Sequence, residues 1–196
     1  MHGRPLIANT SSRSLSVAEH VTAVLVTAAV GAAAGLVAGQ FRLHLGLPGH
    51  KVLFWLTPVL AARLILGGPA GATAGALAAA MATAAAGGNL AGSFVHLPLI
   101  GVAGLVLDVA AWLAERGRLA AAWAIPLMGL AGLAANLVCL GKRLLAPWWG
   151  EAGHTLWGVN AAPVSYALFG LVAGLLGATA AWLVLRRAKR QKQSTP

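Results

Sequence analysis

A short aromatic and polar stretch interrupts the apolar second half of the chain and holds its best candidates for binding chemistry. It reads APWWGEAGHTLWGVN over residues 146–160. Three of the seven tryptophans, one of the four acids and one of the six histidines lie in it: Trp148, Trp149, Trp157, Glu151 and His154. Indole rings stack on flat ligands, and carboxylate and imidazole groups bind cations or polar groups. We therefore predict a lid over a ligand site, and the alternative is an interfacial aromatic belt.

Motifs of enzymatic chemistry are missing from the sequence. It contains no nucleophile elbow, metalloprotease helix or nucleotide-binding loop. The single cysteine, Cys139, excludes an intramolecular disulfide and a cysteine-based metal motif. We expect no enzyme activity, no cofactor and no resident metal. A metal site remains an alternative because four histidines are expected on one side of the membrane, although none has helical ligand spacing: His44, His50, His96 and His154.

The composition indicates an integral membrane protein. The 196 residues are 59% hydrophobic and only 9% charged, with a mean hydropathy of +0.79. Soluble domains carry about a quarter charged residues. The formal net charge of +10 lies in tails and loops that flank apolar stretches, where it sets topology rather than binding nucleic acid. We expect a multi-pass protein of the cytoplasmic (inner) membrane, in contact with the lipid bilayer.

Apolar runs divide the chain into six predicted spans between a polar tail at 1–16 and a basic tail at 186–196. The spans are residues 17–39, 52–66, 70–86, 94–114, 119–140 and 162–185. About 20 residues cross a hydrocarbon core of ~30 Å as a helix. The second and third spans are short, and Pro58 should kink the second, so this hairpin is the part whose crossing is least secure. The predicted fold class is an all-α integral membrane protein, a six-transmembrane-helix bundle.

Charge asymmetry predicts the orientation of this bundle. Six spans place both termini on one side, where ten of the 14 basic residues fall in tails and loops. The positive-inside rule makes that side cytoplasmic, so the topology is N-in/C-in and loops 40–51, 87–93 and 141–161 face outward. Polar groups in a membrane are costly unless they face a cavity or a partner. The predicted substrate-binding set gathers on the outer side: Asn89, His96, Asn136, Trp148, Trp149, Glu151, His154, Trp157, Asn160 and Tyr166.

Two of these residues have structural interpretations that stay open. Glu151 would neutralise the nearby Lys142 or Arg143, and Asn136 would hydrogen-bond to a neighbouring helix. On the inner side, Asp108 is the one acid deep in a predicted span, which makes it a candidate proton or cation relay. We favour a structural ion pair between Asp108 and Arg63, which this topology places at similar depth.

Small residues recur along the first span and after the second. Gly31, Gly35 and Gly39 follow one another at intervals of four with Ala34 and Ala38 beside them, a pattern that lets helix backbones approach closely. The stretch ARLILGGPAGATAGALAAA at 62–80 has an arginine, then Gly-Pro, then a glycine-rich segment. With six spans and aromatic outer loops, the chain resembles the substrate-binding S component of energy-coupling factor (ECF) transporters.

The resemblance implies a function and partners. An S component captures a vitamin or trace-metal nutrient in an outward-facing pocket and associates with a membrane T component and two cytoplasmic ATPases. The small-residue face of the first span (Gly31, Ala34, Gly35, Ala38 and Gly39) would be the surface that docks on the T component. Two other functions stay open. One is a structural or assembly membrane protein without a small ligand. The other is a secondary carrier that uses Asp108, although the sequence contains no evident inverted repeat.

Overall fold

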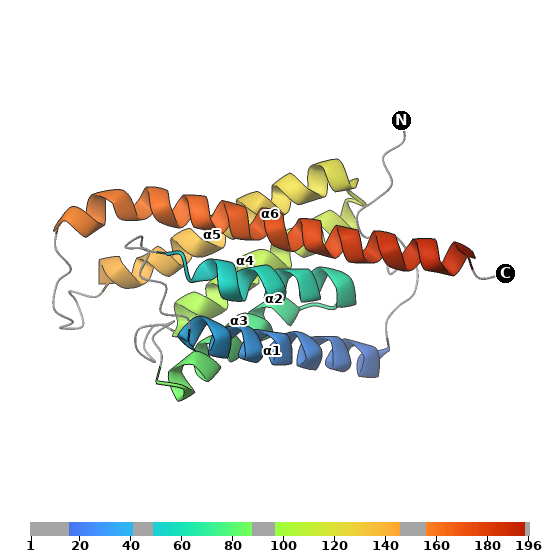
Figure 1. Ribbon diagram of the computed structural model, residues 1–196, viewed down its shortest axis with the longest axis horizontal. Coiled ribbons are helices and arrows are strands. Elements are labelled where there is room, and N and C mark those ends of the chain that lie inside the picture. Colours follow the sequence, from blue (N-terminus) through green and yellow to red (C-terminus); the bar gives the residue numbers. More distant parts are fainter. Residues whose placement is uncertain (1–15, 41–48, 88–96, 146–155, 195–196) are drawn as a thin grey trace.

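The computed structural model describes residues 16–40, 49–87, 97–145 and 156–194. These residues form six helices and confirm an all-α protein (Figure 1). The helices are α1 (Val17–Gln40), α2 (Val52–Leu66), α3 (Gly71–Ala85), α4 (Leu97–Arg116), α5 (Ala121–Leu145) and α6 (Leu156–Ser194).

Helix length separates the six helices into two groups. Four of them, α1, α4, α5 and α6, are long and apolar enough to cross a membrane. Helices α2 and α3 have 15 residues each, which is about 22 Å at the α-helical rise and less than the ~30 Å hydrocarbon core. The chain is thus an integral membrane helical protein of four long apolar helices and a shorter apolar hairpin.

The six helices close into a ring. Helix α1 packs on α3, α3 on α4, α4 on α5, α5 on α6, α6 on α2, and α2 back on α1. Helix α2 also contacts α3 and α4, so it lies closest to the centre of the ring. Successive helices run in opposite directions, and the start of α1 and the end of α6 lie at the same end of the bundle (Figure 1). We call the end of the bundle that holds the start of α1 and the end of α6 the basic end, and we call the opposite end the aromatic end.

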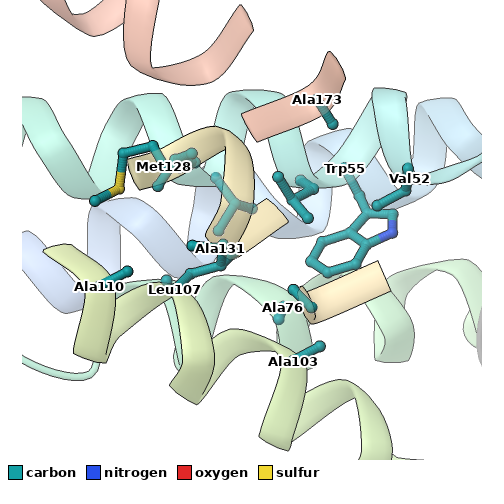
Figure 2. Close-up of a cluster of buried hydrophobic side chains, with 14 of the residues drawn as sticks. Val52, Trp55, Ala76, Ala103, Leu107, Ala110, Met128, Ala131 and Ala173 are labelled. Atoms are coloured by element: carbon teal, nitrogen blue, oxygen red, sulfur yellow. The ribbon is translucent and has the colours of Figure 1, made fainter. Parts of the chain in front are cut away.

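Large side chains from α2 fill the centre of the ring. Its buried residues recur every three or four positions, as on one stripe of a helix: Val52, Trp55, Leu56, Val59, Leu60, Arg63 and Leu64. The neighbouring helices contribute many alanines, and Figure 2 shows Ala76 of α3 and Ala103 of α4 in the same buried cluster as Trp55. The surrounding helices contribute mainly small residues, with Leu107 and Met128 among the few large ones, so one short helix supplies most of the large side chains of the core.

Glycines allow the closest helix crossings. Gly31 and Gly35 of α1 face the backbone of α3, and a Cβ built on Gly35 would lie 2.7 Å from the Ala79 Cα. Helices α5 and α6 meet in the same way, since a Cβ on Gly132 would lie 2.9 Å from the Gly174 Cα. The small-residue face predicted in the first span is therefore used within this chain.

Helix α6 begins earlier than predicted, at Leu156 instead of residue 162. It continues through the basic tail to Ser194, past the predicted end of the membrane span at 185. Trp157 and Asn160 therefore lie on a helix and not in a loop. Residues 186–193 end the apolar run but consist of helix formers (arginine, lysine, glutamine and alanine), so the helix continues past the apolar segment.

Candidate functional sites at the two ends of the bundle

At the basic end, one buried arginine joins two helices. Arg63 stands in the last turn of α2, and its side chain is only 1% exposed. Its Nε donates to Asp108 Oδ1 at 2.9 Å and its Nη1 to Glu115 Oε1 at 2.8 Å. The expected pair with Asp108 is present. Glu115 was missed because it was assigned to a turn, although its i,i+7 spacing from Asp108 places both carboxylates on one face of α4.

Asp108 also caps helix α3. Its Oδ1 accepts the Ala72 N–H at 3.1 Å, and its Oδ2 accepts the Thr73 N–H and hydroxyl, both at 2.8 Å. The residue before α3, Ala70, has a left-handed φ of 62° and offers no side-chain cap. A carboxylate from α4 thus satisfies free N–H groups at the start of α3 and interacts favourably with its dipole.

Gly104 permits this cap to form. A Cβ at Gly104 would lie 2.5 Å from the Thr73 Cα, so the first turn of α3 lies directly against α4. Gly104 is four residues before Asp108 and therefore on the same face of α4. The glycine and the carboxylate act together, because the first brings α3 close and the second binds its exposed N–H groups.

The arrangement restricts what Asp108 can do. An ionised carboxylate has about four acceptor positions, and Asp108 accepts four hydrogen bonds, one of them from Arg63. No acceptor position is left for a bound cation. The geometry fits a structural connection between α2, α3 and α4.

Tryptophans and arginines surround the same end of the bundle. The Arg116 guanidinium lies 5.1 Å from the centre of the Trp112 ring, and Arg186 lies 5.1 Å from that of Trp182. Trp123, near the start of α5, is 73% exposed. Trp112 is exposed as well, and Trp182 is partly buried. Tryptophans and arginines that gather at one level of a membrane protein mark a membrane–water interface. The tryptophans predicted to be functional were those of 146–160, although the pattern Trp-x-x-x-Arg occurs twice in the sequence and was the available signal.

At the aromatic end, residues of α5 and α6 meet the turn that precedes α2. Asn136 of α5 donates from Nδ2 to the Tyr166 carbonyl oxygen of α6 at 2.7 Å, and both residues are buried. The Tyr166 ring packs beside Gly49, where a Cβ would lie 2.9 Å from Cδ2. The His50 and Phe169 rings meet edge to face with centroids 6.3 Å apart. The Asn136 amide is thus used between helices, as its structural interpretation expected.

Most of the predicted binding set lies outside the described residues. These residues are Asn89, His96, Trp148, Trp149, Glu151 and His154. His44, from the alternative metal set, also lies outside the described residues. For Trp157 and Asn160 only the helical backbone is described. Within the described ranges, no group of three or more histidine, cysteine, aspartate or glutamate side chains is placed to hold a metal.

The predicted docking face of α1 is covered by another helix of this chain. Gly31, Ala34, Gly35 and Ala38 are buried, and Gly39 lies beside Thr83 of α3. A partner that used these residues would have to displace α3. The exposed side of α1 carries larger apolar residues instead, among them Leu25 and Leu36.

Comparison of this chain with protein-family models, with curated proteins and with solved structures finds no match. The fold and the two ends of the bundle therefore define the class of protein, a helical integral membrane protein. The two ends of the bundle differ in their contacts. The basic end has paired buried charges and tryptophans in contact with arginines, and the aromatic end has amide and aromatic contacts.

Proposed function

We propose that this protein is the solute-binding subunit of a nutrient uptake transporter in the cytoplasmic membrane. In this proposal it captures a vitamin or a trace metal at the aromatic end, which faces outward. The proposal is supported by the difference between the two ends, because polar and aromatic residues gather at the aromatic end. The connection 146–155, with Trp148, Trp149, Glu151 and His154, joins α5 to α6 at the end where Asn136, Tyr166, His50 and Phe169 already meet.

The proposed orientation rests on charge. The basic end carries Arg116, Arg118 and the five basic residues of 186–192, whereas the aromatic end carries Lys51 and, in the last turn of α5, Lys142 and Arg143. The positive-inside rule then assigns the basic end to the cytoplasm. A lid at 146–155 would meet solutes arriving from outside.

The proposed partners supply energy. The sequence has no nucleotide-binding loop, so the energy for uptake against a gradient must come from a partner or from an ion gradient. By resemblance these partners are a membrane T component and cytoplasmic ATPases. Docking on α1 would involve either its exposed apolar side or, after displacement of α3, the face around Gly35.

A structural protein without a ligand is the second candidate. It is favoured by the Asn136 amide, which donates to the Tyr166 carbonyl and so acts between helices. A carrier based on Asp108 is not favoured, because that carboxylate already accepts four hydrogen bonds from the protein.

Ligand-induced stabilisation separates these functions. The purified chain would be heated without ATP in the presence of a panel of vitamins and divalent metals. A ligand at a hundred times its Kd stabilises a protein by about 2.7 kcal/mol, so one compound should raise the melting temperature. Trp148→Ala and Glu151→Ala should reduce the increase, whereas Trp123→Ala at the basic end should not. A flat response to the whole panel would favour the structural protein.

A further inference from the structure

Helix α6 extends beyond the bundle as a basic segment, the C-terminal extension (residues 186–194). Residues 186–193 are all exposed, and Figure 1 shows this end of α6 projecting past the other helices. The extension carries five cations in one continuous helix: Arg186, Arg187, Lys189, Arg190 and Lys192.

The depth of these cations follows from Trp182. This residue precedes Arg186 by one turn, and its ring is contacted by the Arg186 guanidinium at 5.1 Å. With a rise of 1.5 Å per residue, positions 186–190 lie about 6–12 Å beyond Trp182 along the helix axis. A lipid headgroup layer is roughly 5–8 Å thick on each side of the hydrocarbon core. The first turn of the extension therefore reaches the level of the lipid phosphates.

The acids of the described chain are engaged elsewhere. Glu19 accepts the Ser16 N–H at 2.8 Å in a capping box that starts α1. Asp108 and Glu115 both bind Arg63. The fourth acid, Glu151, precedes α6, and the sequence after it contains no further acid. The described acids are thus engaged elsewhere, and the charge of the extension is available to an external anion.

The arrangement of side chains excludes a flat, surface-lying helix. Successive residues are 100° apart around a helix, so the five cations occupy most of the circumference and only Ala188, Gln191 and Gln193 separate them. Helices that lie in the interface need an apolar face, and the extension has none. It continues α6 through the headgroup layer with cations directed to several sides.

We propose that the C-terminal extension binds the phosphate groups of anionic lipids in the leaflet at the basic end. Charge complementarity and depth select this partner, since α6 itself holds the first of these cations at the level of the headgroups. Arg186 is fixed by its contact with Trp182, while the other four cations are free to reach neighbouring lipids. The protein should therefore enrich anionic over zwitterionic lipid around itself, and salt should weaken the enrichment.

Lipid retention tests this proposal. The full chain would be reconstituted in nanodiscs of equal phosphatidylglycerol and phosphatidylcholine, extracted mildly, and analysed for retained lipid. We expect severalfold more phosphatidylglycerol than phosphatidylcholine with the natural chain at low salt. A variant with glutamine at all five basic positions should retain the two lipids about equally, and Lys189→Arg with Lys192→Arg should behave like the natural chain.

The melting temperature of the glutamine variant and the comparison of lipid ratios decide whether the proposal holds. The glutamine variant should melt close to the natural temperature, because the replaced residues are exposed, glutamine is a good helix former, and the one described contact that is lost is that of Arg186 with Trp182. The proposal would be overturned if the natural chain and a folded glutamine variant retained phosphatidylglycerol and phosphatidylcholine in the same ratio. The extension would then be assigned to an acidic protein partner instead. The solute panel gives an independent result, because it concerns the opposite end of the bundle.

Discussion

Arg63 connects three helices through a single buried guanidinium. It binds two carboxylates of α4, and one of these, Asp108, binds the first turn of α3. Two negative charges face one positive charge, and the remaining compensation comes from the N–H groups and the partial positive charge at the start of α3. The hairpin of α2 and α3 is thereby fixed to α4 at the basic end.

Removing the Asp108 carboxylate should strongly destabilise the protein. Asp108→Ala would leave two N–H groups of α3 without an acceptor and Arg63 with Glu115 alone. Breaking a buried pair by removing one partner costs about 3–5 kcal/mol. Thermal unfolding in detergent, followed by tryptophan fluorescence, should show a large fall in melting temperature.

Two variants serve as controls for this prediction. Asp108→Asn should be milder because one acceptor oxygen remains. Glu115→Gln should also be milder, since the Glu115 side chain is 26% exposed. An Asp108→Ala protein that melts like the natural chain would contradict the structural role and reopen the interpretation of Asp108 as a relay.

At the scale of elements, helix contacts depend on where glycine meets backbone. Gly104 of α4 touches the first turn of α3, whereas Gly101 of the same helix has ordinary space around it: a Cβ there would lie 3.6 Å from Leu77 Cδ2. Glycine patterns in the sequence indicate that close crossings exist. They do not indicate which helix is the partner, because the pairing is a tertiary property.

This difference predicts opposite results for two similar substitutions. Gly104→Ala places a methyl group 2.5 Å from the Thr73 Cα and should destabilise the protein by about 1–3 kcal/mol or more through overpacking. Gly101→Ala should be neutral or stabilising, because alanine favours a helix by about 1 kcal/mol over glycine. Comparison of melting temperatures checks both. Equal effects at the two positions would contradict the packing of α3 on α4.

Element boundaries show which parts of the fold follow from the sequence. All six helices coincide with predicted apolar runs, and the breaker Gly67-Gly68-Pro69 correctly separates α2 from α3. The start of α6 was predicted too late, because residues 156–161 were assigned to the loop before it, whereas the basic tail continues the helix past the apolar run that stops at Leu185. The cap on α3 was not predictable from local sequence, since Ala70 is no capping residue and the carboxylate comes from another helix.

The candidate functional residues also divide into those that the sequence predicts and those that depend on how the helices pack. The Arg63–Asp108 pair was predictable because charges deep in spans have few possible partners, and topology put these two at one depth. The contact between Asn136 and Tyr166 depends on how α5 and α6 cross at Gly132 and Gly170, which the sequence does not fix. The ligand groups of 146–155 lie outside the described residues and stay predictions.

At the scale of the whole molecule, the account requires the basic end to face the cytoplasm. Single cysteines in a Cys139→Ala background test this requirement with a membrane-impermeant maleimide on intact cells. Ser93→Cys should react from outside, and Arg118→Cys should react only after permeabilisation. The reverse labelling pattern would place 146–155 inside the cell and contradict the orientation.

The central claim is that this bundle holds a small solute without ATP, and the solute carried by the purified protein tests it most directly. Protein extracted in mild detergent from cells grown in rich medium would be denatured, and the released small molecules identified and quantified by mass spectrometry. One vitamin or metal should be released at up to one equivalent per chain, with less released from Trp148→Ala. Release of lipid and detergent alone, from protein that also shows no stabilisation by any vitamin or metal, would contradict it.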